Sequence, residues 1–496
     1  MGTEHFYSFK TRWTFPLGIG VGVASSLIPS VSFAQKYDGS GSPNFVPHTL
    51  REAMAAAYLT NPQLREERAR LRAVDEQMPA AQAGWHPTIQ GTLGLTYYKG
   101  NSNYTNNTPI GNGQSIAVPN TQRYSSTGYT GGVTLTQPIY QGGKTVANIR
   151  MAKNQIMAER ARLIAMEQQV LLSVANAYIG VVEDEQLLQI SINNERVLRQ
   201  QLDTANRRFR LGELSRTDVA QAQGALASAS AQRQQAEGTL QSAQATYMQQ
   251  VGIAAPPNLV PPQPLDLPVK EEREAVAMAV HNNPNVVYAL FTEAQQKSNI
   301  STQMATILPK ISAVLGYQHT KDQAAEHSQQ DSKYAELLFQ VPIYQGGGEY
   351  ASVRQARQSA ESAHHEVDVQ RRVALQLASS NWQNYQAYKD SMKSNRIAVK
   401  ADIAALAGVE REALLGTATT LSVLQQQQTL LLAQQALVQT VASLVSSTYT
   451  IASAIGRLTA VDLRLSVPLY DEKAYYKAVK NRLWGISDYA VNEPGR

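Results

Sequence analysis

The feature that most constrains this chain is a long tandem repeat. The hexapeptide PIYQGG occurs at 138–143 and again at 342–347. The same offset of 204 residues aligns Leu211-Gly212 with Leu415-Gly416, and Tyr178 with Trp382. Self-similarity over such a distance indicates that one structural plan is used twice.

Upstream of the hexapeptide the offset changes to 222 residues. Asn61-Pro62 then aligns with Asn283-Pro284, and Pro87 aligns with Pro309. The length difference falls in the Asn/Gly/Ser/Thr-rich stretch 98–128, whose partner near 320–333 is shorter. Because loops absorb insertions and packed elements do not, the sequence predicts a variable loop there.

Long helices follow each hexapeptide. No proline occurs between Pro138 and Pro256 or between Pro342 and Pro468, and Ala, Gln, Leu, Glu and Arg dominate both stretches. The predicted helices cover 144–210 and 216–250 in the first repeat, and 348–414 and 418–455 in the second. The first would be ~100 Å long at 1.5 Å per residue. Shorter helices are expected earlier in each repeat, at 50–60, 63–83, 272–282 and 285–306.

Four short segments alternate apolar and polar residues with the period of a β-strand. They lie at about 85–97, 129–139, 309–319 and 334–343. Their lengths are near the 9–11 residues of a membrane-spanning strand. An ordinary half-buried sheet would show the same alternation. However, little sequence remains to cover an apolar face, which favours lipid as the cover.

Four membrane strands cannot close a barrel, and an open edge in lipid leaves backbone groups unpaired. The chain is therefore expected to pool its strands with copies of itself. Two copies would supply eight strands and three would supply twelve.

The ends of the chain have their own composition. Residues 1–34 resemble a secretory signal peptide, with Lys10 and Arg12 before an apolar run; a membrane anchor is the alternative. A linker follows at 35–48, the first repeat at 49–255, a Pro-rich linker at 256–270, the second repeat at 271–457 and a tail at 458–496.

The absence of cysteine suits an oxidising compartment.

Several functions are disfavoured by the residues present. The formal charge is only +5 and no basic stripe stands out, so nucleic-acid binding is not expected. The first hexapeptide ends in Gly-Lys-Thr, but Pro138 replaces the first glycine of a phosphate-binding loop. Glu361, His364, His365 and Asp368 form two i,i+4 pairs that could hold a metal, but such residues more often form a solvated helix face, which is the preferred interpretation. We expect no enzyme activity, cofactor or metal.

Four segments together resemble the TolC family of outer-membrane efflux and secretion channels. They are TQPIYQGGKTVANIRMA (136–152), RFRLGELSRTDVAQAQ (208–223), FQVPIYQGGGEYASVRQA (339–356) and LLGTATTLSVLQQQQ (414–428). The tail LYDEKAYYKAVKNRLWG (469–485) is similar to the type I secretion subgroup. The resemblance implies a mainly α protein with membrane β-strands. Three copies would form a 12-stranded β-barrel on a 12-helix α-barrel that reaches into the periplasm.

The resemblance also implies roles for particular residues. The periplasmic tips, where an adaptor docks, would contain Arg208, Leu211, Gly212, Ser215, Leu415, Gly416 and Thr419. The arginines Arg207, Arg208, Arg210 and Arg216 either contact a partner or compensate helix dipoles. Pore-constriction candidates are Asp218, Ser422 and Gln425; relatives often carry Asp at the last two positions, so an acidic constriction is in doubt. The strand-to-helix turns would use Pro138, Gly142, Gly143, Pro342, Gly346 and Gly347.

The expected function is a passive trimeric duct in the outer membrane. An adaptor would open it, and an inner-membrane ABC or proton-driven pump would energise it. The alternative is a trimeric coiled-coil scaffold or stalk at the cell surface, which would not need lipid-facing strands.

Overall fold

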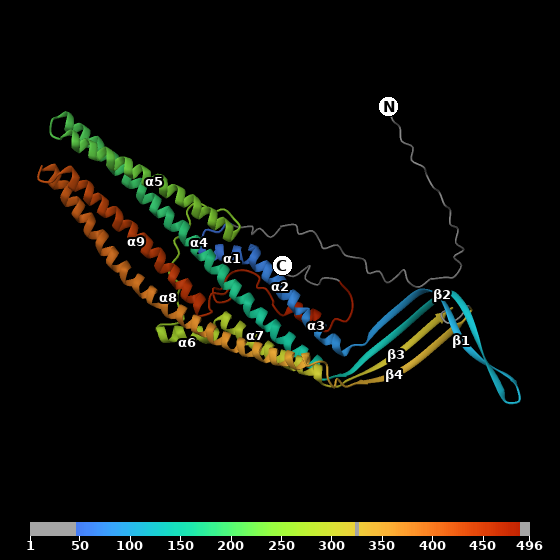
Figure 1. The fold of residues 1–496 in the computed structure, drawn as a ribbon. Helices are drawn as coiled ribbons and strands as arrows, with labels where there is room; N and C mark the ends of the chain where they lie inside the picture. Colours follow the sequence, from blue (N-terminus) through green and yellow to red (C-terminus); the bar gives the residue numbers. More distant parts are fainter. Residues whose placement is uncertain (1–45, 323–326, 487–496) are drawn as a thin grey trace, which may run out of the picture.

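A computed structural model of the chain describes residues 46–322 and 327–486. The predicted signal peptide and most of the linker at 35–48 lie outside these residues. The molecule is elongated, with a β-sheet at one end and two long helical hairpins pointing away from it (Figure 1). Each repeat contributes short helices, two strands and one hairpin. The predicted fold of the single chain is thereby confirmed.

The first repeat runs from short helices through two strands into a helical hairpin. Its elements are α1 (Leu50–Thr60), α2 (Pro62–Asp75), α3 (Gln77–Gln82), β1 (Thr88–Gly111), β2 (Gln114–Gln141), α4 (Lys144–Arg210) and α5 (Arg216–Val251). The continuous helix predicted at 63–83 is wrong, because the helix is interrupted at Glu76. Pro79 explains the break: it has no N–H to donate and its ring would clash with the carbonyl of Asp75.

The second repeat follows the same order. Its elements are α6 (Glu272–Asn282), α7 (Pro284–Met304), β3 (Lys310–Lys321), β4 (Gln329–Gln340), α8 (Gly348–Leu414) and α9 (Thr420–Ala454). The repeated Asn-Pro pair begins α2 and α7 in the same way. Asn61 and Asn283 accept backbone hydrogen bonds through their side chains, and a proline follows at the first helical position.

The four strands form one antiparallel sheet in the order β1-β2-β3-β4. Its register aligns Ile89 with Leu135, Leu135 with Leu315, and Leu315 with Ala335. Directly paired residues share a face, so this row crosses one side of the sheet. Many apolar side chains on that side are exposed, including Leu93 at 91%. No helix covers this face in the described residues (Figure 1).

The predicted loop at 98–128 is also wrong. β1 and β2 continue as a two-stranded ribbon beyond the ends of β3 and β4, and they turn at Asn112-Gly113. Both turn residues have positive φ, 52° and 71°, which is typical of the tight turn that joins twisted strands. The polar composition misled the prediction because backbone pairing, rather than burial of apolar side chains, holds this ribbon together.

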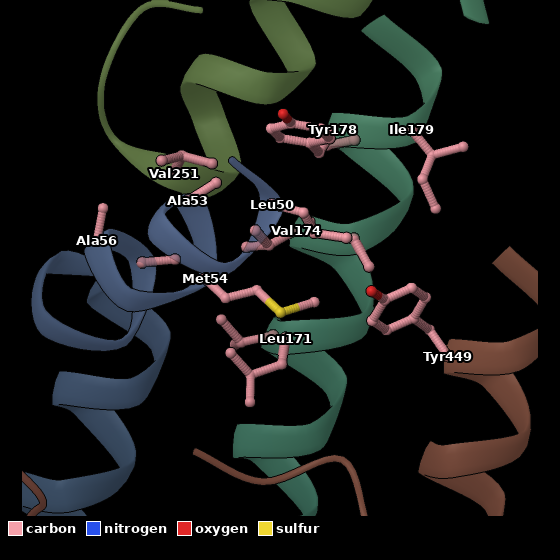
Figure 2. Close-up of a cluster of buried hydrophobic side chains, with 14 of the residues drawn as sticks. Leu50, Ala53, Met54, Ala56, Leu171, Val174, Tyr178, Ile179, Val251 and Tyr449 are labelled. Carbon is pink, nitrogen blue, oxygen red and sulfur yellow. The ribbon is translucent and has the colours of Figure 1, made fainter. Parts of the chain in front are cut away.

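The main core lies where α1, α4, α5 and α9 meet, about halfway along α4. Leu171, Val174 and Tyr178 of α4 point toward α1, and Tyr449 approaches from α9 (Figure 2). The Tyr178 hydroxyl donates to the carbonyl oxygens of His48 and Val260, at 2.6 and 2.8 Å. The chain segments before α1 and after α5 are thereby fastened to the long helix.

The repeat partner of Tyr178 anchors a second, smaller core. Trp382 of α8 packs with Ala275 and Ala279 of α6 and with Ile451 of α9. The two repeats therefore share the core position but not its composition.

The helices lie in one curved layer. On the sheet side α7 lies between α4 and α8, and on the far side α9 lies between them (Figure 1). α2 and α8 lie at opposite edges of this layer on the sheet side. Of the helices the structure describes, α9 is long and apolar enough to span a membrane by length and composition. α9 packs on α4 and α8, so contacts between helices also explain its apolar composition.

Candidate functional site

The two hairpins end in closely similar turns, far from the sheet. In the first, the amide of Glu213 donates to the Arg208 carbonyl at 3.0 Å, and Gly212 has φ +81°. In the second, the amide of Thr417 donates to the Glu412 carbonyl at 3.0 Å, and Gly416 also has φ +81°. Such left-handed helix ends favour glycine, which accounts for the repeated Leu-Gly pair.

Each turn is followed by a side-chain cap that starts the returning helix. The Ser215 hydroxyl accepts a hydrogen bond from the Asp218 amide, and an Asp218 carboxylate oxygen accepts from the Ser215 amide at 3.0 Å. Hydrogen bonds from the Ser215 side chain and backbone lower the pKa of Asp218. In the second turn Thr419 accepts from the amide of Ser422 at 3.1 Å.

These caps bear on the constriction candidates. Asp218 and Ser422 are repeat partners, and both side chains are engaged at helix starts in the single chain. Gln425 lies one turn further along α9 and is exposed. Asp218 and Ser422 therefore have the same position in the caps of α5 and α9, whereas Gln425 takes no part in a cap.

The tips expose large apolar side chains. Leu211 is 74% exposed, Leu414 76% and Leu415 81%. Nearby, the guanidinium of Arg208 lies 3.0 Å from a carboxylate oxygen of Glu213. Each hairpin therefore carries exposed leucine side chains at its end.

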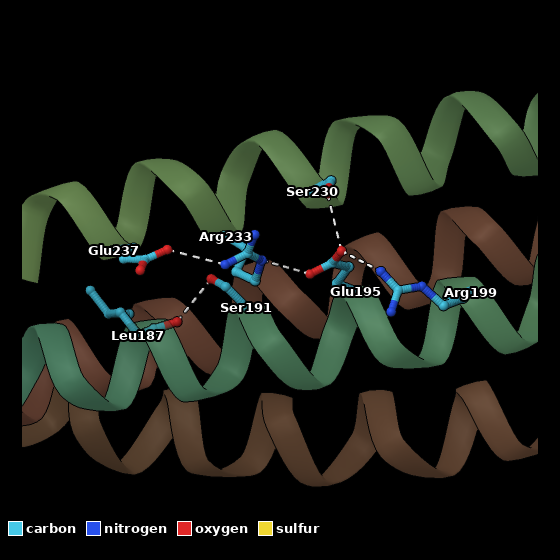
Figure 3. Close-up of polar contacts among 7 residues, drawn as sticks. All are labelled: Leu187, Ser191, Glu195, Arg199, Ser230, Arg233 and Glu237. Atoms are coloured by element: carbon cyan, nitrogen blue, oxygen red, sulfur yellow. Dashed lines mark hydrogen bonds and ion pairs between the residues drawn. The ribbon is translucent and has the colours of Figure 1, made fainter.

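A buried carboxylate fastens the first hairpin between its tip and the core. Glu195 of α4 is 8% exposed. It lies 2.8 Å from Arg199 on the same helix and 2.8 Å from Arg233 of α5, and Ser230 of α5 donates to it at 3.0 Å (Figure 3). Arg233 also reaches Glu237 at 3.1 Å. The sequence alone does not reveal this cluster, because Glu195 and its partners on α5 are 35 or more residues apart in the chain.

A polar contact also joins the two hairpins. The Gln427 side chain of α9 donates to the Asn194 side chain of α4 at 3.1 Å. Asn194 is next to Glu195, so the intra-hairpin cluster and the inter-hairpin bond lie at the same height along α4.

The two hexapeptides lie where strand gives way to helix. Gly143 and Gly347 immediately precede α4 and α8, with φ of 81° and 83°. Gly142 and Gly346 also have positive φ. The strand register shifts next to Pro138, and Pro342 follows the end of β4 at Gln340. The glycine pairs therefore occupy the same turn in both repeats, whereas Pro138 lies within β2 and Pro342 lies beyond β4.

The two histidines considered for metal binding each contact a different carboxylate. His364 lies 3.1 Å from Glu293 of α7, and His365 lies 3.3 Å from Glu361. Within residues 46–322 and 327–486, no group of three or more metal-ligating side chains comes together.

Comparisons with known proteins agree on one family. The profile of the family described as Outer membrane efflux protein matches residues 54–252 and 275–457. The chain is 31% identical over 440 residues to outer membrane efflux protein BepC of Brucella suis biovar 1 (strain 1330), covering 88% of this chain and 92% of that protein. It is 25% identical over 446 residues to outer membrane protein TolC of Escherichia coli (strain K12), covering 84% and 83%. A crystal structure of CusC, reported with transmembrane channel formation, is similar in fold, with a TM-score of 0.70 at 15% identity over 86% of this chain and 95% of that one.

Proposed function

This chain belongs to the outer membrane efflux protein family and is an outer-membrane export channel, and we propose that it acts as a homotrimer coupled to an adaptor and an inner-membrane pump. The observation that carries the proposal is the exposed apolar row on one face of the sheet. A cell-surface stalk, the alternative function, would have no use for that row.

The sheet itself argues for several copies. β1 and β4 are its edge strands, and the sheet is too narrow to close. In lipid each unpaired backbone group costs several kcal/mol, so the edges require partners. Pairing β4 of one copy with β1 of the next closes a barrel, and three copies give twelve strands. Lipid would then cover the row that includes Ile89, Leu135 and Leu315.

The internal repeat indicates how the helices of neighbouring copies meet. Within one copy α4 packs on α7, with Asn154 bonded to Ser298 and Thr302 bonded to Asn148. The repeat partner of α4 is α8, and the partner of α7 is α2. Since α8 and α2 are the free edges of the layer, the same packing between copies would continue the layer into a closed tube.

We further propose that the two tips dock the adaptor. The exposed Leu211 and Leu415 would supply apolar contacts, and Arg208 would supply charge beside them. Gly212, Gly416, Ser215 and Thr419 hold these side chains in place. Asp218, Ser422 and Gln425 would line the narrow end of the tube, where twelve helices converge.

The channel is tested with purified protein in detergent and in planar lipid bilayers. We expect a particle with the mass of three chains and discrete ionic conductance steps. A monomer that produces no conductance steps would refute the trimeric channel.

The tips are tested by Leu211→Asp combined with Leu415→Asp, in cells that otherwise lack the channel. We expect trimers to form but a fluorescent dye that wild-type cells extrude to accumulate. Val461→Asp is the matched control, since Val461 is 65% exposed and lies away from both tips. Normal extrusion by the tip variant would remove the docking assignment while leaving the trimer intact.

A further inference from the structure

The C-terminal tail packs against one edge of the molecule. Its short helix α10 (Ala474–Val479) lies beside α2. The Tyr475 hydroxyl donates to the Glu76 carboxylate at 2.8 Å, and the guanidinium of Arg160 lies 5.5 Å from the centre of the Tyr476 ring. The tail is therefore fastened at α2, which is an edge of the helical layer.

Beyond these contacts the tail presents apolar side chains to the outside. Leu483 is 73% exposed, Trp484 85% and Ile486 72%. The segment turns back over Glu76 and Tyr475 and borders an open hollow of about 400 Å³, which Arg482 and Trp484 also line. Three large apolar side chains in four consecutive positions are unusual on a surface that faces water.

We propose that this tail clasps the neighbouring copy, with Trp484 and its apolar neighbours lying on the outer face of α8 in that copy. The inference rests on the trimer of the proposed function. It goes further by assigning the tail to the joint between copies, in addition to the contacts of strands and long helices.

The repeat locates the joint. Asn154 of α4 donates to Ser298 of α7 at 3.3 Å within one copy. Moving Asn154 forward by 204 residues gives Gln358 of α8, and moving Ser298 back by 222 residues gives Glu76, which directly follows α2. Glu76 of one copy should therefore lie beside Gln358 of the next. Since Tyr475 is bonded to Glu76, the tail lies at this joint.

The receiving surface suits an aromatic anchor. Gln358 is exposed and is flanked by Arg354 and Arg357, which are also exposed. A guanidinium over a tryptophan face is a favourable contact, and tryptophan and arginine are both enriched where protein surfaces bind. On the other side of α8, Ala363 faces the groove shared with Tyr288 of α7. That side of α8 packs on α7 of the same copy, so it does not face the neighbouring copy.

The absence of native cysteine allows a direct test by cross-linking. Two single variants, Trp484→Cys and Gln358→Cys, are co-expressed, and the membranes are treated with a flexible bismaleimide. We expect a covalent species with the mass of two chains that appears only when both variants are present. Ala363→Cys replaces Gln358→Cys as the matched control and should give no such species with Trp484→Cys.

A second pair tests the trimer separately from the clasp. Ser352 and Ala80 are the repeat partners of Asn148 and Thr302, which are bonded within one copy. Co-expressed Ser352→Cys and Ala80→Cys should cross-link between copies whether or not the tail takes part. If this pair links and the Trp484 pair does not, the clasp is wrong and the trimer stands. If neither pair links, the trimer fails and the clasp with it.

Discussion

The glycines after α5 and α9 allow a prediction that separates backbone strain from crowding. Gly252 and Gly456 are repeat partners with nearly the same backbone, at φ of 83° and 78°. A Cβ at Gly252 would meet the Thr60 hydroxyl at 3.4 Å, an ordinary contact. A Cβ at Gly456 would lie 2.5 Å from the carbonyl oxygen of Asn282, which is backbone at the end of α6.

The magnitudes follow from these distances. An alanine in the left-handed region costs roughly 1–2 kcal/mol, and Gly252→Ala should lose about that much stability. Gly456→Ala carries the same strain and must also displace α6, which adds about 1–3 kcal/mol of overpacking. We therefore expect Gly456→Ala to be the more damaging change by about 1–3 kcal/mol, although the two sequences around these glycines look alike.

The assay is thermal loss of helical circular dichroism in detergent, with hydrogen exchange of α6 as a local measurement. Both variants should melt below the wild type, Gly456→Ala should melt lowest, and exchange in α6 should rise only in that variant. Gly238→Ala is a control, because Gly238 lies inside α5 with open space around it and alanine favours helix there. Equal melting of the two repeat partners would refute the argument from crowding.

Three further predictions concern other parts of the chain. Glu195→Ala should destabilise the first hairpin by about 1–3 kcal/mol. This is less than the loss expected for a fully buried ion pair, because the Arg233 side chain is partly exposed to solvent. Hydrogen exchange in α5 should rise near Arg233. Burial raises the pKa of Glu167 above its ordinary 4.5, so its folded form favours the proton and wild-type stability falls as pH rises through the folded pKa. Glu167→Gln should therefore gain stability relative to wild type as the pH rises above 4.5; a difference independent of pH would contradict this. A peptide tag inserted between Asn112 and Gly113 should be tolerated and accessible to antibody on intact cells, whereas a tag protected until the outer membrane is broken would reverse the assigned orientation.

The long helices were predictable because their signals are local. Gly143 and Gly347 need positive φ just before each helix, Gly212 and Gly416 need it just after, and no proline interrupts the span between. α4 and α8 accordingly occupy the ranges that the sequence predicts. The strands were predictable in kind, since their alternation has period two.

Other features could not be predicted because they depend on contacts between distant residues. The ribbon at 98–128 is held by backbone pairing, which its polar side chains do not reveal. Glu195 becomes a buried ion-pair partner only when α5 folds back on α4. The tail gains its place through Tyr475 and Glu76, which are 399 residues apart.

By itself, the sequence determined the repeated plan, the helix ends and the open sheet with one apolar face, because these depend on backbone conformation and on the spacing of neighbouring side chains. Only the tertiary structure decided which aligned residues of the two repeats have the same surroundings. Gly252 has room and Gly456 does not, and the tail packs beside α2, whereas α7 is flanked by α4 and α8. The physical reason is that a repeated sequence meets different neighbours in each half, and packing rather than local propensity sets what each residue contributes.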